Sequence, residues 1–168
     1  MANFNTILSN IWEDNKFRKL TDSKSKLLFI HAFSNPRCPI SGIYKISIET
    51  MAFETGVDQH GCEKSLREVI SVGLVSYDYE KNVIWVHGKI KHDKSWTTKQ
   101  RVKSIQRSLG EFSKCSFMQS FFSLYPFLID LAIEEEQKEK ELRGCKAPEE
   151  ESPLEAGGAS ASEKDGSG

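Results

Sequence analysis

The chain has 168 residues, of which 28% are charged and 38% are hydrophobic, so it has the length of one domain with polar appendages and the composition of a soluble globular protein. Its formal net charge of -1 is the sum of two unlike parts, because residues 1–133 carry 18 basic and 13 acidic side chains whereas residues 134–168 carry 5 and 11. The high share of charged residues excludes a chain dominated by membrane spans. The net positive charge of residues 1–133 favours a polyanionic partner.

The first predicted helix covers residues 22–33. Thr21 is its expected N-cap, and apolar residues recur within it at helical spacing. Pro36 ends the helix, because the residue before a proline is pushed out of the helical conformation. Residues 42–46 are short, apolar and β-prone, which predicts a strand.

Two further helices are expected on either side of a tight turn. Ser47 can cap the first of them, and Gly56 can end it. Asp58 can cap the second, which covers residues 58–72 and has one apolar and one polar face.

Two β-rich runs follow, residues 74–79 and residues 83–87, separated by the polar tip Glu80-Lys81-Asn82. This pattern predicts a hairpin with a short turn. The order helix, strand, helix, turn, helix and hairpin is that of the winged helix-turn-helix arrangement.

The composition shifts beyond the hairpin. Residues 87–107 hold seven Lys and Arg residues against one Asp, and residues 97–110 are expected to be helical. Two more helices are expected within residues 115–142, interrupted at Pro126. Residues 143–168 have too little apolar content to form a core and are expected to be disordered.

The predicted fold class is therefore α+β and mostly helical. It comprises a winged helix-turn-helix domain in residues 1–95, a basic and aromatic helical extension in residues 96–142, and a disordered acidic tail in residues 143–168.

Several stretches of the chain resemble a known family: Ile11–Phe29, Asn35-Pro36, Ser41–Tyr44, Ala52–Gly56 and Gly73–Asp78. In these stretches the chain resembles the N-terminal winged-helix domain of phage replisome organisers, which are replication initiators related to the primosome protein DnaD. The similarity extends over residues 11–125 and rests on positions that determine the fold.

The resemblance implies a double-stranded DNA-binding protein that acts in the initiation of phage or prophage DNA replication, in the cytoplasm of a bacterial host. It also implies a homo-oligomer on origin DNA and contacts with host helicase-loading or other replication proteins. Family members commonly continue into a C-terminal domain that engages single-stranded DNA or this machinery, whereas this sequence continues into an acidic low-complexity segment.

The helix over residues 58–72 is the expected recognition helix. Its polar side chains are candidates for contacts with base edges and phosphates in the major groove: Gln59, His60, Lys64, Arg67 and Ser71. An alternative is a solvated helix face, since Glu63 with Arg67, and Lys64 with Glu68, are oppositely charged pairs at i,i+4 spacing.

The wing tip and the basic segment supply the remaining candidates. Lys81 and Asn82 lie in the tip, where a winged helix reaches the minor groove or the DNA backbone. The segment beyond it supplies cations that would clamp flanking phosphates without reading sequence: Lys89, Lys91, Lys94, Lys99, Arg101, Lys103 and Arg107. Trp96 could stack on an exposed base, which makes single-stranded DNA a second candidate partner, or it could pack the segment onto the wing. A solvated amphipathic helix is the alternative interpretation of the cations.

The aromatic residues between 117 and 128 allow two interpretations, core packing and a self-association surface. The four cysteines are far apart and form no CxxC pair, which favours reduced thiols and no zinc site. No nucleotide-binding or catalytic motif is present, so we expect neither an enzyme nor a cofactor. A winged-helix transcriptional regulator and a winged-helix protein-interaction module remain as alternatives.

Overall fold

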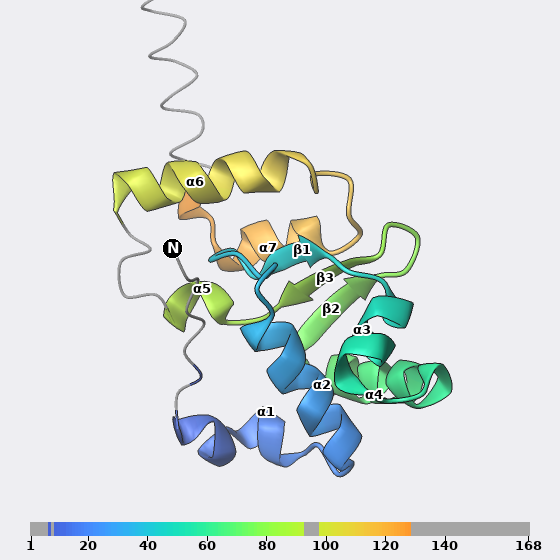
Figure 1. The fold of residues 1–168 in the computed structure, drawn as a ribbon. Helices are drawn as coiled ribbons and strands as arrows, with labels where there is room; N and C mark the ends of the chain where they lie inside the picture. The colour runs from blue at the N-terminus through green and yellow to red at the C-terminus, as the bar shows by residue number, and fades with distance from the viewer. Residues whose placement is uncertain (1–6, 8, 93–97, 129–168) are drawn as a thin grey trace, which may run out of the picture. The chain divides into compact units, whose positions relative to one another are not determined.

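The structure is a computed structural model that describes residue 7, residues 9–92 and residues 98–128. The chain divides into two compact units, Met1–Ile133 and Glu134–Gly168, and all described residues belong to the first (Figure 1). The first unit is α+β and mostly helical, which confirms the predicted class at that level. The predicted disorder of residues 143–168 lies outside the described residues.

The elements follow one another in the order helices, strand, helices, hairpin, helices. Their bounds are η1 Ser9–Glu13, α1 Asn15–Arg18, α2 Ser23–Ser34, β1 Ile43–Lys45, α3 Ile48–Thr55, α4 Gln59–Ser71, β2 Val75–Asp78, β3 Val83–Val86, α5 Lys89–His92, α6 Lys99–Gly110 and α7 Met118–Leu124. The short η1, α1 and α5 were not predicted. The helix expected to continue beyond Pro126 lies mostly outside the described residues.

Local capping sets the bounds of α3 and α4 as predicted. The Ser47 hydroxyl accepts a hydrogen bond from the Thr50 amide, and the Asp58 carboxylate accepts one from the Gly61 amide. Gly56 ends α3 with φ of 70°, a left-handed conformation that favours glycine. These interactions span only a few residues, which is why the sequence alone indicates them.

The predicted cap of α2 was wrong by one residue. Asp22 is the N-cap, and its carboxylate accepts a hydrogen bond of 2.9 Å from the Lys24 amide. Thr21 instead donates from its backbone amide and from its hydroxyl to Oε1 of Glu68 in α4. The Thr21 side chain, which the sequence suggests as a local helix cap, therefore makes a tertiary hydrogen bond instead.

The sheet is antiparallel with the strand order β1-β3-β2, so β3 is central. Successive side chains of a strand point to opposite faces of the sheet, and all four residues of β3 are buried. Ile84 and Val86 belong to one hydrophobic core, whereas Val83 and Trp85 belong to another.

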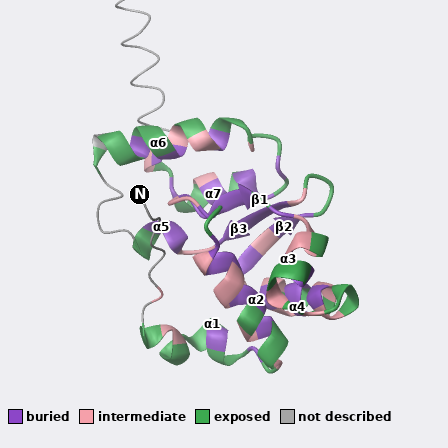
Figure 2. Ribbon diagram, viewed as in Figure 1, coloured by how far each residue is buried: buried purple, intermediate pink, exposed green. Residues whose placement is uncertain are grey.

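The two cores place helices on both faces of the sheet. The core around Ile84 contains side chains of α2, α3 and α4, and the core around Trp85 contains side chains of α6 and α7. Figure 1 shows α2, α3 and α4 on one side of the sheet and α6 and α7 on the other. Figure 2 shows the strands buried between these layers and the outward-facing positions of the helices exposed. Residues 98–128 thus share a core with the sheet and belong to the same compact unit.

The aromatic residues of the extension form part of this second core. Phe117, Phe121 and Tyr125 are buried, and the Phe121 ring lies 5.3 Å from the Trp85 ring in an edge-to-face arrangement. Of the two interpretations that the sequence allows, core packing therefore holds for these residues.

Within the described part of the chain, no helix has both the length and the apolar character needed to cross a membrane.

Candidate nucleic-acid interface

Helix α4 separates an apolar and a polar face cleanly. Cys62, Leu66 and Val69 are buried in the first core. His60, Lys64, Arg67 and Ser71 are all exposed. At 3.6 residues per turn, these four positions fall within a sector of about 60° on the helix surface. The structure therefore brings four of the five predicted α4 residues onto one face.

The fifth residue, Gln59, lies at the start of the helix and to one side of this face. Its side-chain amide donates to the Glu49 carboxylate in α3 at 3.4 Å. At the other end, the Ser71 hydroxyl donates to the Glu68 carbonyl at 2.7 Å, which leaves its oxygen able to accept a further hydrogen bond.

Glu68 does not neutralise the cations of α4. Its carboxylate accepts hydrogen bonds from the Ser25 hydroxyl at 2.5 Å and from the amide and hydroxyl of Thr21. These bonds, that from Ser25 first, lower the pKa of Glu68 below its ordinary value. The ion pair between Lys64 and Glu68 that the spacing suggested is absent from the described residues.

Arg67 is only loosely held. Its guanidinium lies 3.5 Å from the Glu63 carboxylate, and its side chain is 70% exposed. An exposed pair of this kind contributes little to stability and is easily exchanged for another anion. The face of α4 therefore presents Lys64 and Arg67 to solvent with one weakly paired acid beside them.

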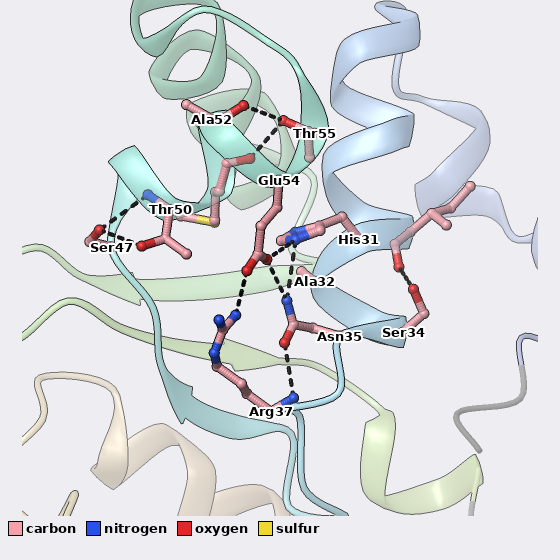
Figure 3. Close-up of polar contacts among 12 residues, drawn as sticks. His31, Ala32, Ser34, Asn35, Arg37, Ser47, Thr50, Ala52, Glu54 and Thr55 are labelled. Atoms are coloured by element: carbon pink, nitrogen blue, oxygen red, sulfur yellow. Dashed lines mark hydrogen bonds and ion pairs between the residues drawn. The ribbon is translucent and has the colours of Figure 1, made fainter. Parts of the chain in front are cut away.

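One carboxylate of α3 makes several polar contacts with the C-terminal end of α2 and the residues after it (Figure 3). Glu54 of α3 accepts hydrogen bonds from His31 Nε2 at 2.6 Å, from Asn35 Nδ2 at 3.0 Å and from Arg37 at 2.6 Å. The Arg37 guanidinium is the main reason that the pKa of Glu54 is lowered. Helix α4 is joined to α2 separately, through the shared core and through Glu68.

Hydrogen bonds of the Asp78 and Asn82 side chains stabilise the tip of the hairpin. Asp78 is buried and accepts hydrogen bonds from the amides of Lys81 and Ser116, and its carboxylate lies 3.5 Å from the Lys81 ammonium. Asn82 has φ of 53°, and its side-chain oxygen accepts a hydrogen bond from the Tyr77 hydroxyl at 3.0 Å. Lys81 is exposed at the tip, whereas the Asn82 side chain serves the turn itself.

Two exposed residues near the tip were missed by the sequence reasoning. Tyr79 is 53% exposed, and Lys45 is exposed at the end of β1, where it pairs in register with Val83 beside the turn. An alternating polar residue in an apolar strand is the only sequence signal for Lys45. Its proximity to the hairpin follows from strand pairing, which the sequence does not reveal.

Lys89 requires a correction, because it is not a surface cation. It is only 7% exposed, its ammonium donates to the Phe33 carbonyl at 2.9 Å, and it lies 4.0 Å from the centre of the Phe33 ring. Burial lowers its pKa. Lys89 therefore satisfies a carbonyl at the end of α2 and cannot reach a phosphate in this conformation.

Gly42 allows this arrangement. It has φ of 74°, and a Cβ atom at this position would lie 2.6 Å from the Val86 carbonyl oxygen and 2.8 Å from Cβ of Lys89. The close approach of the chain before β1 to the start of α5 therefore requires glycine.

The other predicted cations of the basic segment are distributed over α5 and α6. Lys91 is exposed on α5, and Arg101, Lys103 and Arg107 are exposed on α6. Lys94 and the neighbouring Trp96 lie outside the described residues, and Lys99 is the first residue of α6.

The α4 face and the α6 cations lie on different layers. Helix α4 packs on the Ile84 side of the sheet and α6 on the Trp85 side (Figure 1). The structure therefore does not bring the α6 cations beside the α4 face, as a single clamp on one duplex would require.

A cleft of about 560 Å³ lies between the N-terminal helices and the start of α5. Phe29, Phe33, His87 and Lys91 are among the residues that line it. Both His87 Nδ1 and the Lys16 ammonium lie within hydrogen-bonding distance of the Gly73 carbonyl, at 3.0 and 2.9 Å. Burial is the main cause of the lowered pKa of His87, so the neutral imidazole, which donates from Nδ1, fits this position.

The described residues contain no cluster of histidine, cysteine and carboxylate side chains that could hold a metal ion. Cys38, Cys62 and Cys115 are buried free thiols, and burial raises the pKa of both Cys38 and Cys62 to about 11.

Comparison of the chain with models of protein families, with curated proteins and with solved structures returned no match.

Proposed function

We propose that the chain binds double-stranded DNA through a winged helix-turn-helix domain. Helices α3 and α4 are the helix-turn-helix pair in this proposal, α4 is the recognition helix, and the β2–β3 hairpin is the wing. The order of these elements and the tight turn at Gly56 support the assignment.

One observation carries the proposal. The polar face of α4 gathers His60, Lys64, Arg67 and Ser71. Of the two acidic residues that could neutralise it, Glu63 is only loosely paired with Arg67, and Glu68 accepts hydrogen bonds from Ser25 of α2 and from Thr21. A helix of 13 residues is about 20 Å long and fits the major groove of B-form DNA. Lys64 and Arg67 can bind phosphates or guanine edges, and His60 and Ser71 can bind base edges or the backbone.

The wing supplies contacts outside the groove. Lys81 at the tip and Lys45 beside it can bind phosphates, and Tyr79 can pack against the sugar-phosphate backbone. These contacts would add affinity that falls with salt and carries no sequence information.

The biological role is proposed from the sequence resemblance. The chain acts in the initiation of phage or prophage replication in a bacterial cytoplasm, where several copies assemble on origin DNA and recruit host replication proteins by protein contact. It performs no catalytic step itself.

Fluorescence anisotropy tests the proposal. The chain is titrated into a labelled duplex from its own gene neighbourhood, a scrambled duplex and a single strand, each at two salt concentrations. We expect the native duplex to bind most tightly and to keep its advantage at the higher salt. Weak, equal and salt-labile binding to all three would contradict sequence-specific recognition and favour an interaction module. If the native duplex lies in the chain's own promoter and the chain represses a reporter there, the regulator alternative is favoured over the initiator.

A further inference from the structure

Helix α6 has an unusual charge composition. Its 12 residues include four basic side chains and no acidic one. Arg101, Lys103 and Arg107 are exposed, and no ion pair of the described residues involves Arg101 or Arg107. The outer surface of α6 is therefore a cationic face rather than a mixed solvated one.

The cationic face is held rigidly. Val102, Ile105 and Leu109 of α6 are all buried in the core that contains Trp85. Because these three residues anchor one side of the helix, Lys103 and Arg107 lie on the opposite side, away from the sheet, and Arg101 is exposed at the flank. Arg101 and Arg107 are six residues apart, which corresponds to about 9 Å along the helix axis and about 120° around it.

The sheet separates this face from α4. Side chains alternate along β3, and its two sets contact the helix layers of α4 and of α6 separately. A duplex seated on the α4 face is therefore on the other side of the sheet from the cations of α6.

The chemistry of α6 favours a duplex backbone over other partners. A protein partner usually needs an apolar anchor at the centre of the interface, and the exposed large hydrophobic residues of the described chain include none from α6. Single-stranded DNA is usually held by aromatic stacking, and α6 has no aromatic residue. A group of cations without either feature matches phosphates alone.

We propose that α6 is a second DNA-binding surface that holds the phosphate backbone of another duplex segment, so that one molecule bridges two segments. This inference rests on the proposed function, because α4 binds the first segment. The first segment is held by sequence-dependent contacts, whereas the second is held by charge alone. Bridging of this kind would bring separate parts of an origin region together.

A capture experiment tests the bridge. A duplex from the protein's gene neighbourhood is fixed to beads, the full chain is added, and retention of a second, labelled duplex of unrelated sequence is measured. The double variant Arg101→Glu, Arg107→Glu should retain the second duplex about tenfold less well, since two phosphate contacts are lost. Its affinity for the bead-bound duplex should remain close to that of the wild type.

The matched control is Arg18→Glu, Lys19→Glu, which makes the same change of charge on exposed residues of α1 and its C-cap. This variant should retain the second duplex as the wild type does. Light scattering should show the same oligomeric state for all three proteins, and circular dichroism should show the same helix content.

Three results would overturn the bridge while leaving the proposed function intact. The first is a wild-type chain that binds the fixed duplex but retains no second one. The second is an α6 variant that retains the second duplex fully, as an oligomer using only α4 would. The third is a change of oligomeric state in the α6 variant, because α6 would then be a protein interface. A wild-type chain that binds no duplex at all would contradict the proposed function itself.

Discussion

Lys89 holds the end of α2 from inside the fold. Its ammonium and the Tyr44 hydroxyl donate to the carbonyls of Phe33 and Ala32, two of the carbonyls that the last turn of a helix leaves without partners. The sequence could not reveal this role, because Lys89 stands among other polar residues and its partner is 56 positions away. Burial and not composition decides what this lysine does.

Replacing Lys89 with methionine should lower the free energy of unfolding by about 1–3 kcal/mol at neutral pH, because the Phe33 carbonyl loses a charged donor. The matched control is Lys91→Met, two residues along and exposed on the same helix, which should change stability little. Urea unfolding measures both, and equal stabilities of the two variants would contradict the role assigned to Lys89.

The pH dependence gives a second readout of the same substitution. Because the pKa of Lys89 is lower in the folded protein, the unfolded chain binds more protons between the two pKa values. The stability of the wild type relative to the methionine variant should therefore increase as pH rises through the folded pKa of Lys89 toward the ordinary lysine value of about 10.4. The other buried titratable groups are the same in both proteins, so they cancel in this difference.

At the scale of elements, the hairpin and the extension depend on each other through Asp78. Its carboxylate accepts amide hydrogen bonds from Lys81 within the turn and from Ser116 before α7. Trp85 adds an apolar contact to the same link, since its ring lies 5.8 Å from that of Phe117. The hairpin is thus stabilised by a segment that the sequence predicts to belong to a separate extension.

The substitution Asp78→Asn should lower the free energy of unfolding by about 1–3 kcal/mol, because a buried carboxylate that accepts two amides is replaced by a group with one acceptor oxygen. The hydrogen bond from Ser116 is the first cause of the lowered pKa of Asp78, so the wild type keeps this stability above the ordinary aspartate pKa of about 3.9. The stability is lost as pH falls through the folded pKa.

Unfolding curves at neutral pH and near pH 3 check this prediction. The difference between wild type and Asp78→Asn should be largest at neutral pH and should shrink in acid. A difference that does not change with pH would show that packing, and not the charge of Asp78, links the hairpin to residues before α7.

Elements defined by local chemistry were predictable from the sequence. Ser47, Gly56 and Asp58 act within a few residues of their own positions, and the structure confirms their roles. Helices α1 and α5 have four residues each, too few to give a periodic pattern. The prediction that Thr21 caps α2 was wrong, because its actual partner, Glu68, is close to it only after folding.

At the scale of the whole compact unit, the sheet separates the exposed surface of α4 from that of α6. Its strand β3 carries Ile84 toward one layer of helices and Trp85 toward the other. The sequence identified the residues of α4 and α6 as basic or polar candidates but could not tell which side of the sheet each helix covers. That choice depends on the packing of α6 and α7, and it changes the expected mode of binding from one clamp to two surfaces.

The central claim is that the polar face of α4 reads duplex DNA. The most direct test is the ratio of affinities for the native and the scrambled duplex, measured by anisotropy for the double variant Lys64→Glu, Arg67→Glu. The variant Arg101→Glu, Arg107→Glu is the control with the same change of charge. We predict that this ratio is at least about tenfold lower in the α4 variant than in the wild type, since each lost base or phosphate contact costs about 1–3 kcal/mol. The α6 variant should keep the wild-type ratio. A ratio that survives in the α4 variant would contradict the claim.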